Sequence, residues 1–398
     1  CPHSHLGDLG GIKGEDSHIA IVHVDGNDIG KLVQKAKNLK TSRYLSKTIS
    51  DAIEKAFEKV IENAIKKYNL IINSLGYDLN KIDIDPRYPK EHILDDDSLR
   101  NLEQHNEFPE YYLKALKKIT NKSGGNENKF IQNLQEKLNL LFKKDINFSK
   151  KERQLLIKYA KKRKILPIRP IILGGDDVTF VCDGRLGIYF AKNFIEEFEK
   201  TKINNKKITA CAGISILKTK YPFYRGYWLA EELCANAKKK RKHDDENTSY
   251  LDFHIAMSGI AGELSEIRER FFGIDPRDND KTSKPYLLYR PFKIVPPDTF
   301  DELSLDLFLT KVCQLIEPKT GLSKNKLNDL RNVLTLSDDA WTEFVQTLKY
   351  RDNSLPEIEG HQYEETLYEN NITPYFDMLE IARFYPQFAL KEIGEAND

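Results

Sequence analysis

The chain has few cysteines, and they do not occur in pairs. Its 398 residues include five cysteines and no Cys-x-x-Cys motif, so the sequence favours neither a zinc ribbon nor a disulfide framework. No apolar run approaches the length of a membrane span, and no signal-peptide pattern opens the chain. We therefore expect a protein of the reducing cytoplasm that makes no contact with a membrane.

A strong net charge is also absent. The 62 lysines and arginines almost balance the 61 aspartates and glutamates, which excludes a protein that binds polyanions through overall charge alone. With 40% apolar and 31% charged residues, the composition is typical of a globular protein large enough for about two or three domains. No internal repeat divides the chain. Composition and charge therefore do not indicate a function, and short sequence motifs have to be considered.

The first strong pattern is a short apolar run that ends in a carboxylate. Residues 19–25 read Ile-Ala-Ile-Val-His-Val-Asp, which predicts a buried strand ending at Asp25. The residues that follow break this strand: Gly26-Asn27-Asp28-Ile29-Gly30. Apolar residues then recur at helical spacing from Leu45 to Tyr68 and predict one long amphipathic helix.

A second acidic turn follows a long interruption. Residues 75–165 are polar and rich in lysine, and we interpret them as a mostly helical insertion. Residues 168–173 and 178–182 then predict two short strands joined as a β-hairpin. The turn between them reads Gly174-Gly175-Asp176-Asp177.

The order of predicted elements indicates the fold. A helix (residues 186–200), a strand (208–216) and a second helix (227–240) follow the hairpin. Strand, helix, hairpin, helix, strand is the order of a ferredoxin-like palm of the α+β class, an antiparallel sheet with helices on one face. We divide the chain into an N-terminal extension (1–17), two parts of the palm (18–74 and 166–292), the insertion (75–165) and a C-terminal helical domain (293–398).

The two acidic turns carry ligands suited to divalent cations. Mg²⁺ prefers carboxylates and water, and nucleotidyl transfer needs such ions to align a hydroxyl with an α-phosphate. We therefore expect Asp25, Asp176 and Asp177 to be catalytic and to bind metal, together with Gly26. Successive side chains of a strand point to opposite faces, so periodicity leaves open which of the two hairpin aspartates is the ligand.

The glycines beside these carboxylates suit a nucleotide. Gly174 and Gly175 lack a Cβ and would let a base or sugar approach the backbone closely. The segment from Gly26 to Gly30 opens a helix and would present N–H groups to the triphosphate. Each motif alone is also an ordinary acidic turn. Together they favour function, because each ends an apolar strand and both occur in the order of one palm.

These two motifs resemble the catalytic palm of the large polymerase-like subunit of type III CRISPR effector complexes, a family related to diguanylate cyclases and class III adenylyl cyclases. Residues 210–215 resemble the next strand of that palm, and residues 221–238 resemble the helix after it. The resemblance covers residues 18–255 except the insertion. It implies that Lys238 contacts the triphosphate.

The resemblance also implies an activity. It suggests that ATP is joined into a cyclic oligoadenylate or cyclic dinucleotide, a messenger in antiviral defence, with two Mg²⁺ or Mn²⁺ ions. The family usually has Asp where Asn27 stands, and its CRISPR subunits contain two facing palms, whereas one is visible here. We therefore favour a stand-alone relative that pairs with a second copy or with a separate palm subunit.

Other interpretations stay open at this point. The chain could be a non-catalytic, nucleotide-binding subunit of an RNA-guided complex, or a templated polymerase. Residues 143–164 are strongly basic and could bind RNA, although few aromatic residues suited to base stacking occur there, which favours a solvated helix face. We interpret the basic run 238–244 as a solvated loop, and the aromatic residues 221–228 mainly as core packing.

Overall fold

The computed structural model describes a defined part of the chain. The described residues are 18–67, 70–71, 92–93, 132, 135–136, 161–162, 167–244, 247–256, 262–273, 286–296, 301, 303–318, 320–358, 362–364, 367–368 and 372–397. The chain divides into two compact units, Cys1–Tyr77 with Leu166–Asp398, and Asp78–Ile165. The predicted extension (1–17) and almost all of the predicted helical insertion (75–165) lie outside the described residues.

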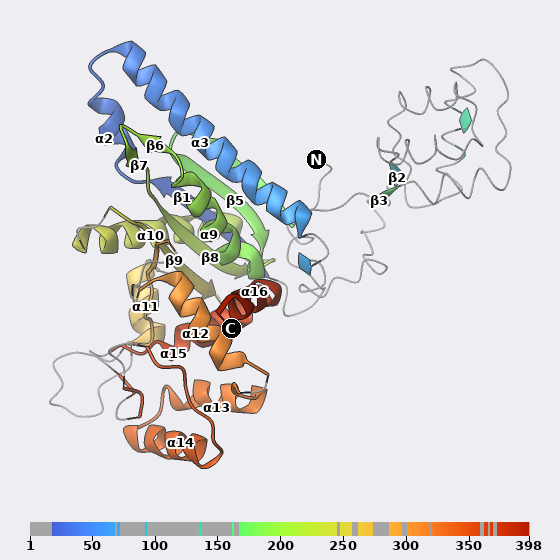
Figure 1. Ribbon diagram of the computed structural model, residues 1–398, viewed down its shortest axis with the longest axis vertical. Coiled ribbons are helices and arrows are strands. Elements are labelled where there is room, and N and C mark those ends of the chain that lie inside the picture. The colour runs from blue at the N-terminus through green and yellow to red at the C-terminus, as the bar shows by residue number, and fades with distance from the viewer. Residues whose placement is uncertain are drawn as a thin grey trace. The chain divides into compact units, whose positions relative to one another are not determined.

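A six-stranded sheet forms the centre of the first unit (Figure 1). Its strands, in order across the sheet, are β10 (Phe292–Ile294), β9 (Ser249–Ala256), β8 (Ala210–Lys218), β1 (His18–Gly26), β5 (Asp177–Asp183) and β4 (Ile168–Gly174). Strand β1 pairs antiparallel with both β5 and β8, whereas β8 and β9 are parallel. The α+β class is confirmed, and the predicted hairpin is the antiparallel β4–β5 pair.

Two helices pack on one face of the sheet, as expected for the palm. They are α3 (Leu39–Lys66), the long blue helix of Figure 1, and α9 (Gly187–Phe198), which follows a short 3₁₀ turn at Gly184–Leu186. Side chains alternate along a strand, and Ala20, Val22 and Val24 of β1 join the core beneath these two helices. The side chains on the other face of β1 therefore pack against other elements of the chain.

A further helix layer covers part of the opposite face. Helix α10 (Phe223–His243) packs there beside α11 (Leu264–Phe272), against Ile19 and Ile21 of β1. The approach of α10 to β8 needs Gly213, because a Cβ at this position would lie 2.0 Å from the carbonyl oxygen of Ala230. These helices lie within the predicted second part of the palm (166–292), after strand β8, and add a second helix layer to the sheet.

Two features of the sheet region were not predicted. Strand β9 contains the polar residues Ser249, Asp252 and His254, which interrupt its apolar pattern, yet all eight of its residues are buried. A short hairpin, β6 (Lys202–Ile203) and β7 (Lys206–Lys207), also lies between α9 and β8. In the second unit, β2 (His92–Ile93) and β3 (Lys161–Lys162) form an antiparallel pair.

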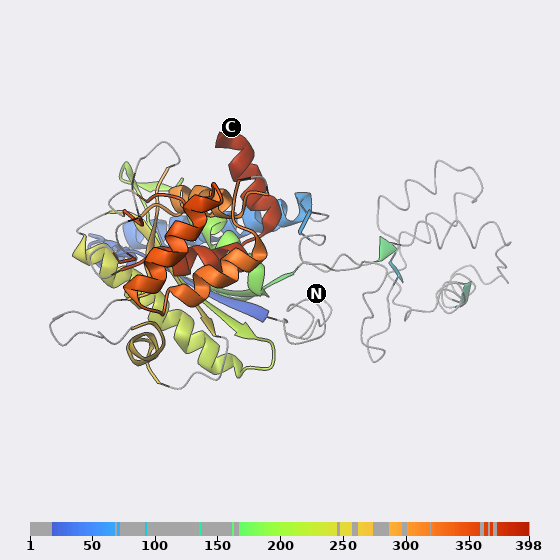
Figure 2. The same ribbon diagram turned by 90° about the horizontal axis from the view of Figure 1, so that it is seen from below.

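The C-terminal part is helical, and its helices share the core of the sheet. They are α12 (Leu305–Ile316), α13 (Lys324–Val333), α14 (Asp338–Tyr350), α15 (Tyr375–Phe384) and α16 (Gln387–Asn397), orange to red in Figure 2. Phe308 of α12 packs on Phe292 of β10 with ring centroids 4.5 Å apart. Strand β10 thus spans the boundary that we predicted between the palm and the helical domain.

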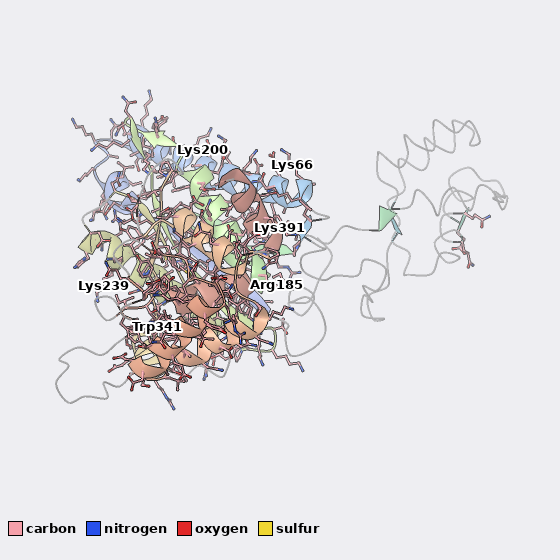
Figure 3. The ribbon with its side chains drawn as sticks, turned by 60° about the horizontal axis from the view of Figure 1, so that its bottom comes forward. Lys66, Arg185, Lys200, Lys239, Trp341 and Lys391 are labelled. Carbon is pink, nitrogen blue, oxygen red and sulfur yellow. The ribbon has the colours of Figure 1, made fainter. Side chains whose placement is uncertain are left out.

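Charged side chains lie on the outside of this unit. Figure 3 labels four exposed lysines, Lys66, Lys200, Lys239 and Lys391, and also Trp341, which is buried in the helical part. Among the described residues, no helix combines the length and the apolar character needed to cross a bilayer.

Candidate active site

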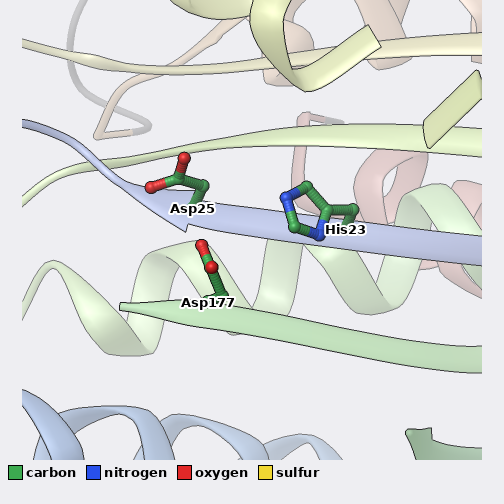
Figure 4. A group of neighbouring side chains, drawn as sticks. All are labelled: His23, Asp25 and Asp177. Atoms are coloured by element: carbon green, nitrogen blue, oxygen red, sulfur yellow. The ribbon is translucent and has the colours of Figure 1, made fainter. Parts of the chain in front are cut away.

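Two carboxylates face each other at the ends of neighbouring strands. The register of β1 and β5 pairs Asp25 with Asp177. His23 lies two residues before Asp25 and therefore points to the same face, the one that carries α10. Figure 4 shows the three side chains together, His23 and Asp25 from β1 and Asp177 from β5. One possible metal-ligand atom from each lies within 4.8 Å of the others.

The turn of the hairpin is tied to the end of β1. Gly175 has a φ of 67°, a left-handed conformation that favours glycine, and a Cβ at Gly174 would meet nothing within 4 Å. The backbone N–H of Gly26 donates to the carbonyl oxygen of Asp176 at 3.1 Å. Asp176 therefore lies beside the carboxylate pair, but it is Asp177 that stands opposite Asp25.

Crowded negative charge marks this site electrostatically. The pKa of Asp177 is raised, first by partial burial and then by the charges of Asp25 and Asp176, while His23 and Lys238 act in the opposite direction. A bound cation relieves such repulsion, and opposed carboxylates are ligands that Mg²⁺ and Mn²⁺ accept. The donor set therefore fits the divalent metal expected from the sequence.

Helix α10 brings a cation and an aromatic ring to the same place. Lys238 forms an ion pair with Asp25, and the two side chains are 25% and 28% exposed. Tyr227 lies about three turns earlier on α10, where its ring meets that of His23 edge-on with centroids 5.9 Å apart. Burial and a hydrogen bond to Glu231 raise the pKa of Tyr227. Lys238 thus lies beside the first acidic turn, and its contact with a triphosphate stays a prediction.

The turn after β1 is held by contacts from distant segments. Asp28 has a left-handed φ of 57°, and its carboxylate accepts hydrogen bonds from Lys31 (2.9 Å) and Arg241 (2.8 Å). These hydrogen bonds hold the pKa of Asp28 below its ordinary value. Asn27 donates from its side-chain Nδ2 to Thr209 Oγ1 at 3.0 Å and from its backbone to the Thr209 carbonyl at 2.8 Å.

Part of the predicted triphosphate cradle is already engaged within the protein. The N–H groups of Gly26 and Asn27 donate to protein carbonyls, and Ile29 is buried at the start of α2 (Ile29–Gln34). Gly30 is exposed, and a Cβ there would meet nothing within 4 Å. A role for Asp28 to Gly30 in nucleotide binding stays a prediction.

Sequence reasoning missed two residues of this region. His23 was treated only as part of an apolar strand, although its period-two relation to Asp25 places both on one face. Arg241 was assigned to a solvated loop, but α10 continues to His243 and Arg241 is buried against Asp28. That interpretation of residues 238–244 was wrong, because helical spacing turns one of these cations inward.

Comparison with known proteins adds a family likeness to this geometry. Residues 98–247 match the family model described as the second palm domain of Cas10/Cmr2. The match covers less than half of the chain and is a likeness to that palm domain. The matched stretch includes the hairpin turn and Lys238, whereas Asp25 precedes it. No curated protein matches the chain.

Solved structures give a weaker likeness. The chain is similar to chains in two crystal structures of a Csm1-Csm4 cassette, one in complex with pppApA and one with cA4. The first comparison gives a TM-score of 0.34 at 10% identity, and the second 0.30 at 12%. Each covers 95% of this chain and 37% or 38% of the other, so the chain spans less than two fifths of the length of those chains.

Proposed function

We propose that this palm is a metal-dependent nucleotidyltransferase that joins ATP into a cyclic oligoadenylate or a cyclic dinucleotide and releases pyrophosphate. The observation that carries the proposal is the opposed pair of Asp25 and Asp177, with Lys238 reaching across from α10. The choice of adenine and a role in antiviral defence follow from the resemblance of the motifs.

Each part of the site has a role in this reaction. Asp25 and Asp177 would hold divalent cations, which supply neutralisation of phosphate charge and alignment of the attacking hydroxyl. Lys238, which pairs with Asp25 in the absence of substrate, would pair with phosphate oxygens once a triphosphate is bound. The open backbone at Gly174 and Gly175 would admit the nucleoside.

We further propose that a second palm completes the site. Joining two nucleotides requires that both be held in reacting geometry, and one carboxylate pair orients one of them. The matching model is that of a second palm domain, which supports pairing between palms. The edge strand β4 also leads into the catalytic turn with Ile171, Ile172 and Leu173 each more than 40% exposed. A second copy of the chain or a separate palm subunit would fit this edge.

A second candidate function is a palm that binds nucleotide without catalysis, as a subunit of an RNA-guided complex. The ion pair between Lys238 and Asp25 favours it, because this pair neutralises the first carboxylate without a metal. On this alternative, ATP binds but no product forms, and RNA or further subunits accompany the chain.

Mass spectrometry of reaction products tests the proposal. The protein is incubated with Mn²⁺ and all four nucleoside triphosphates, beside Asp176→Ala/Asp177→Ala. A matched control is Asp338→Ala/Asp339→Ala, an exposed acidic pair at the start of α14. We expect a cyclic adenylate from the wild type and the control, and none from the hairpin variant.

Other outcomes separate the alternatives. ATP binding by equilibrium dialysis without any product supports the binding subunit, whereas linear products that require an added template indicate a polymerase. The same cyclic product from the hairpin variant would overturn the catalytic assignment of Asp176 and Asp177.

A further inference from the structure

A nitrogen donor stands beside the two carboxylates. His23 is 7% exposed and lies on the same face of β1 as Asp25, and its ligand atom is within 4.8 Å of those of Asp25 and Asp177. Mg²⁺ sites are built from oxygen ligands, whereas imidazole suits first-row transition metals. Carboxylates alone would serve Mg²⁺, so the buried imidazole changes the chemistry that this site offers.

The orientation of the ring is fixed by two neighbours. His23 Nδ1 lies 3.1 Å from Oγ1 of Thr179, a fully buried residue directly opposite on β5, and the edge-on ring of Tyr227 bounds the imidazole from α10. In Figure 4 the other ring nitrogen faces the two aspartates. When Nδ1–H donates to the threonine hydroxyl, Nε2 keeps its lone pair, which is the tautomer that a metal ligand needs.

We propose that His23 completes Asp25 and Asp177 as a mixed nitrogen and oxygen ligand set that selects a first-row transition metal over Mg²⁺. This inference rests on the proposed function, since it concerns the metal held by the same carboxylates. Thr179 acts as a positioning residue that sets the tautomer of His23. Metal-bound histidines generally depend on such partners, and their loss costs roughly 10- to 100-fold in metal affinity.

Pulsed electron paramagnetic resonance of bound Mn²⁺ tests the ligand directly. The full chain is loaded with Mn²⁺ in the presence of inorganic tripolyphosphate, which would offer Lys238 phosphate oxygens and contains no nitrogen of its own. We expect the bound Mn²⁺ to show hyperfine coupling to an imidazole nitrogen. This measurement needs no variant and no turnover.

Variants then assign the nitrogen. His23→Gln should lose the coupling and lower the preference for Mn²⁺ over Mg²⁺, measured by competition, by roughly 10-fold or more. Thr179→Val keeps the imidazole and should retain the coupling while weakening Mn²⁺ binding by roughly 10-fold. The matched control His243→Gln, an 82% exposed side chain on α10, should change neither coupling nor preference.

The outcomes distinguish this inference from the proposed function. One outcome is that Asp25→Asn abolishes Mn²⁺ binding while the Mn²⁺ bound to the wild type shows no coupling to nitrogen. This result would leave the metal at the carboxylates and overturn the role of His23. The same follows if His23→Gln leaves the Mn²⁺ to Mg²⁺ preference unchanged. Absence of Mn²⁺ binding, or binding unaffected by Asp25→Asn, overturns both the inference and the metal site of the proposed function.

Discussion

At the scale of single residues, Asp25 has two competing cationic partners. Lys238 forms an ion pair with Asp25 in the described structure, and a divalent metal would bind the same carboxylate during catalysis. Charges of the same sign at one carboxylate repel each other, so metal and lysine cannot both interact with it at full strength. On the proposed function, a triphosphate would resolve the competition by giving Lys238 an alternative set of oxygens.

Replacing this lysine should therefore affect metal and nucleotide in opposite directions. We expect Lys238→Met to strengthen Mn²⁺ binding in the absence of nucleotide, and to weaken ATP binding by about 10-fold or more through loss of a charge-assisted hydrogen bond. Isothermal titration calorimetry measures both. Lys239→Met, the exposed neighbour, serves as control. Parallel weakening of both ligands in Lys238→Met would contradict the competition.

His254 on β9 gives a second prediction, on pH. Burial, followed by the charges of Arg268 and Arg290, lowers the pKa of His254 to about 3. In the unfolded chain His254 therefore takes up a proton as the pH falls through about 6.5, whereas in the folded protein its imidazole stays neutral. His254 thus lowers the free energy of unfolding as the pH drops below 6.5. We expect His254→Leu to reduce this slope by about 1 kcal/mol per pH unit between pH 6.5 and 5.

Urea unfolding at several pH values measures that slope. His243→Gln is the control, because its side chain is 82% exposed. A slope that is the same in His254→Leu and the wild type would show that the folded protein accommodates the charged imidazole.

At the scale of elements, α10 organises the site. It carries Lys238 to Asp25, Tyr227 to His23 and Arg241 to Asp28, so one helix contacts both the carboxylate face and the turn after β1. The distance between α10 and the sheet depends on Gly213 of β8, because this glycine allows the backbones of α10 and β8 to approach each other closely. The position of α10 therefore sets the geometry of these three contacts at once.

Gly213→Ala should displace this helix. The new Cβ would meet the Ala230 carbonyl oxygen at 2.0 Å and the Cys234 nitrogen at 2.3 Å, both backbone atoms that cannot rotate away. We expect a loss of about 1–3 kcal/mol in the free energy of unfolding, as for other overpacked sites. Nucleotidyl transfer should fall further than the folded fraction does, because Lys238 moves with α10.

The matched control is Gly394→Ala in α16, where a Cβ meets nothing within 4 Å. It should leave stability unchanged or raise it by up to about 1 kcal/mol, because alanine favours a helix over glycine. Urea denaturation and product assays compare the two variants. A Gly213→Ala protein as stable as Gly394→Ala would show that α10 can shift at little cost.

At the scale of the whole molecule, one buried cluster joins the palm to the C-terminal helices. The guanidinium of Arg290 lies 3.6 Å from the ring centroid of Phe253 on β9 and donates to the Phe253 carbonyl oxygen at 2.7 Å. It also forms ion pairs with Asp377 and Glu380 of α15. The helices and the sheet therefore belong to one compact unit rather than to loosely connected domains.

Breaking this cluster should uncouple the helices from the palm. Arg290→Met leaves two carboxylates buried without their cation, which costs about 3–5 kcal/mol. Calorimetry should show a lower melting temperature, and hydrogen exchange should show α15 opening first. Lys349→Met, which removes an exposed ion pair to Glu364, should cost at most about 1 kcal/mol. Equal losses in the two variants would argue against a coupling role for Arg290.

The strands and carboxylates that could be predicted from the sequence are those that short stretches of neighbouring residues specify. Strand β1 and the β4–β5 hairpin are short apolar runs with polar ends, so both their existence and the carboxylates at their ends follow from neighbouring residues. Strand β9 escaped prediction because its polar residues become acceptable only inside the fold. Asp252, for example, is buried because Arg268 donates to both of its carboxylate oxygens.

The sequence by itself determined the palm order and the two acidic turns, because these depend on residues close together in the chain. Only the tertiary structure decided that Asp177 rather than Asp176 opposes Asp25, since strand register is set by pairing across the sheet. It also brought Arg241 to Asp28, 213 positions apart, and placed His23 close to Asp177 of the neighbouring strand. Such contacts arise from packing between distant segments, which no local pattern encodes.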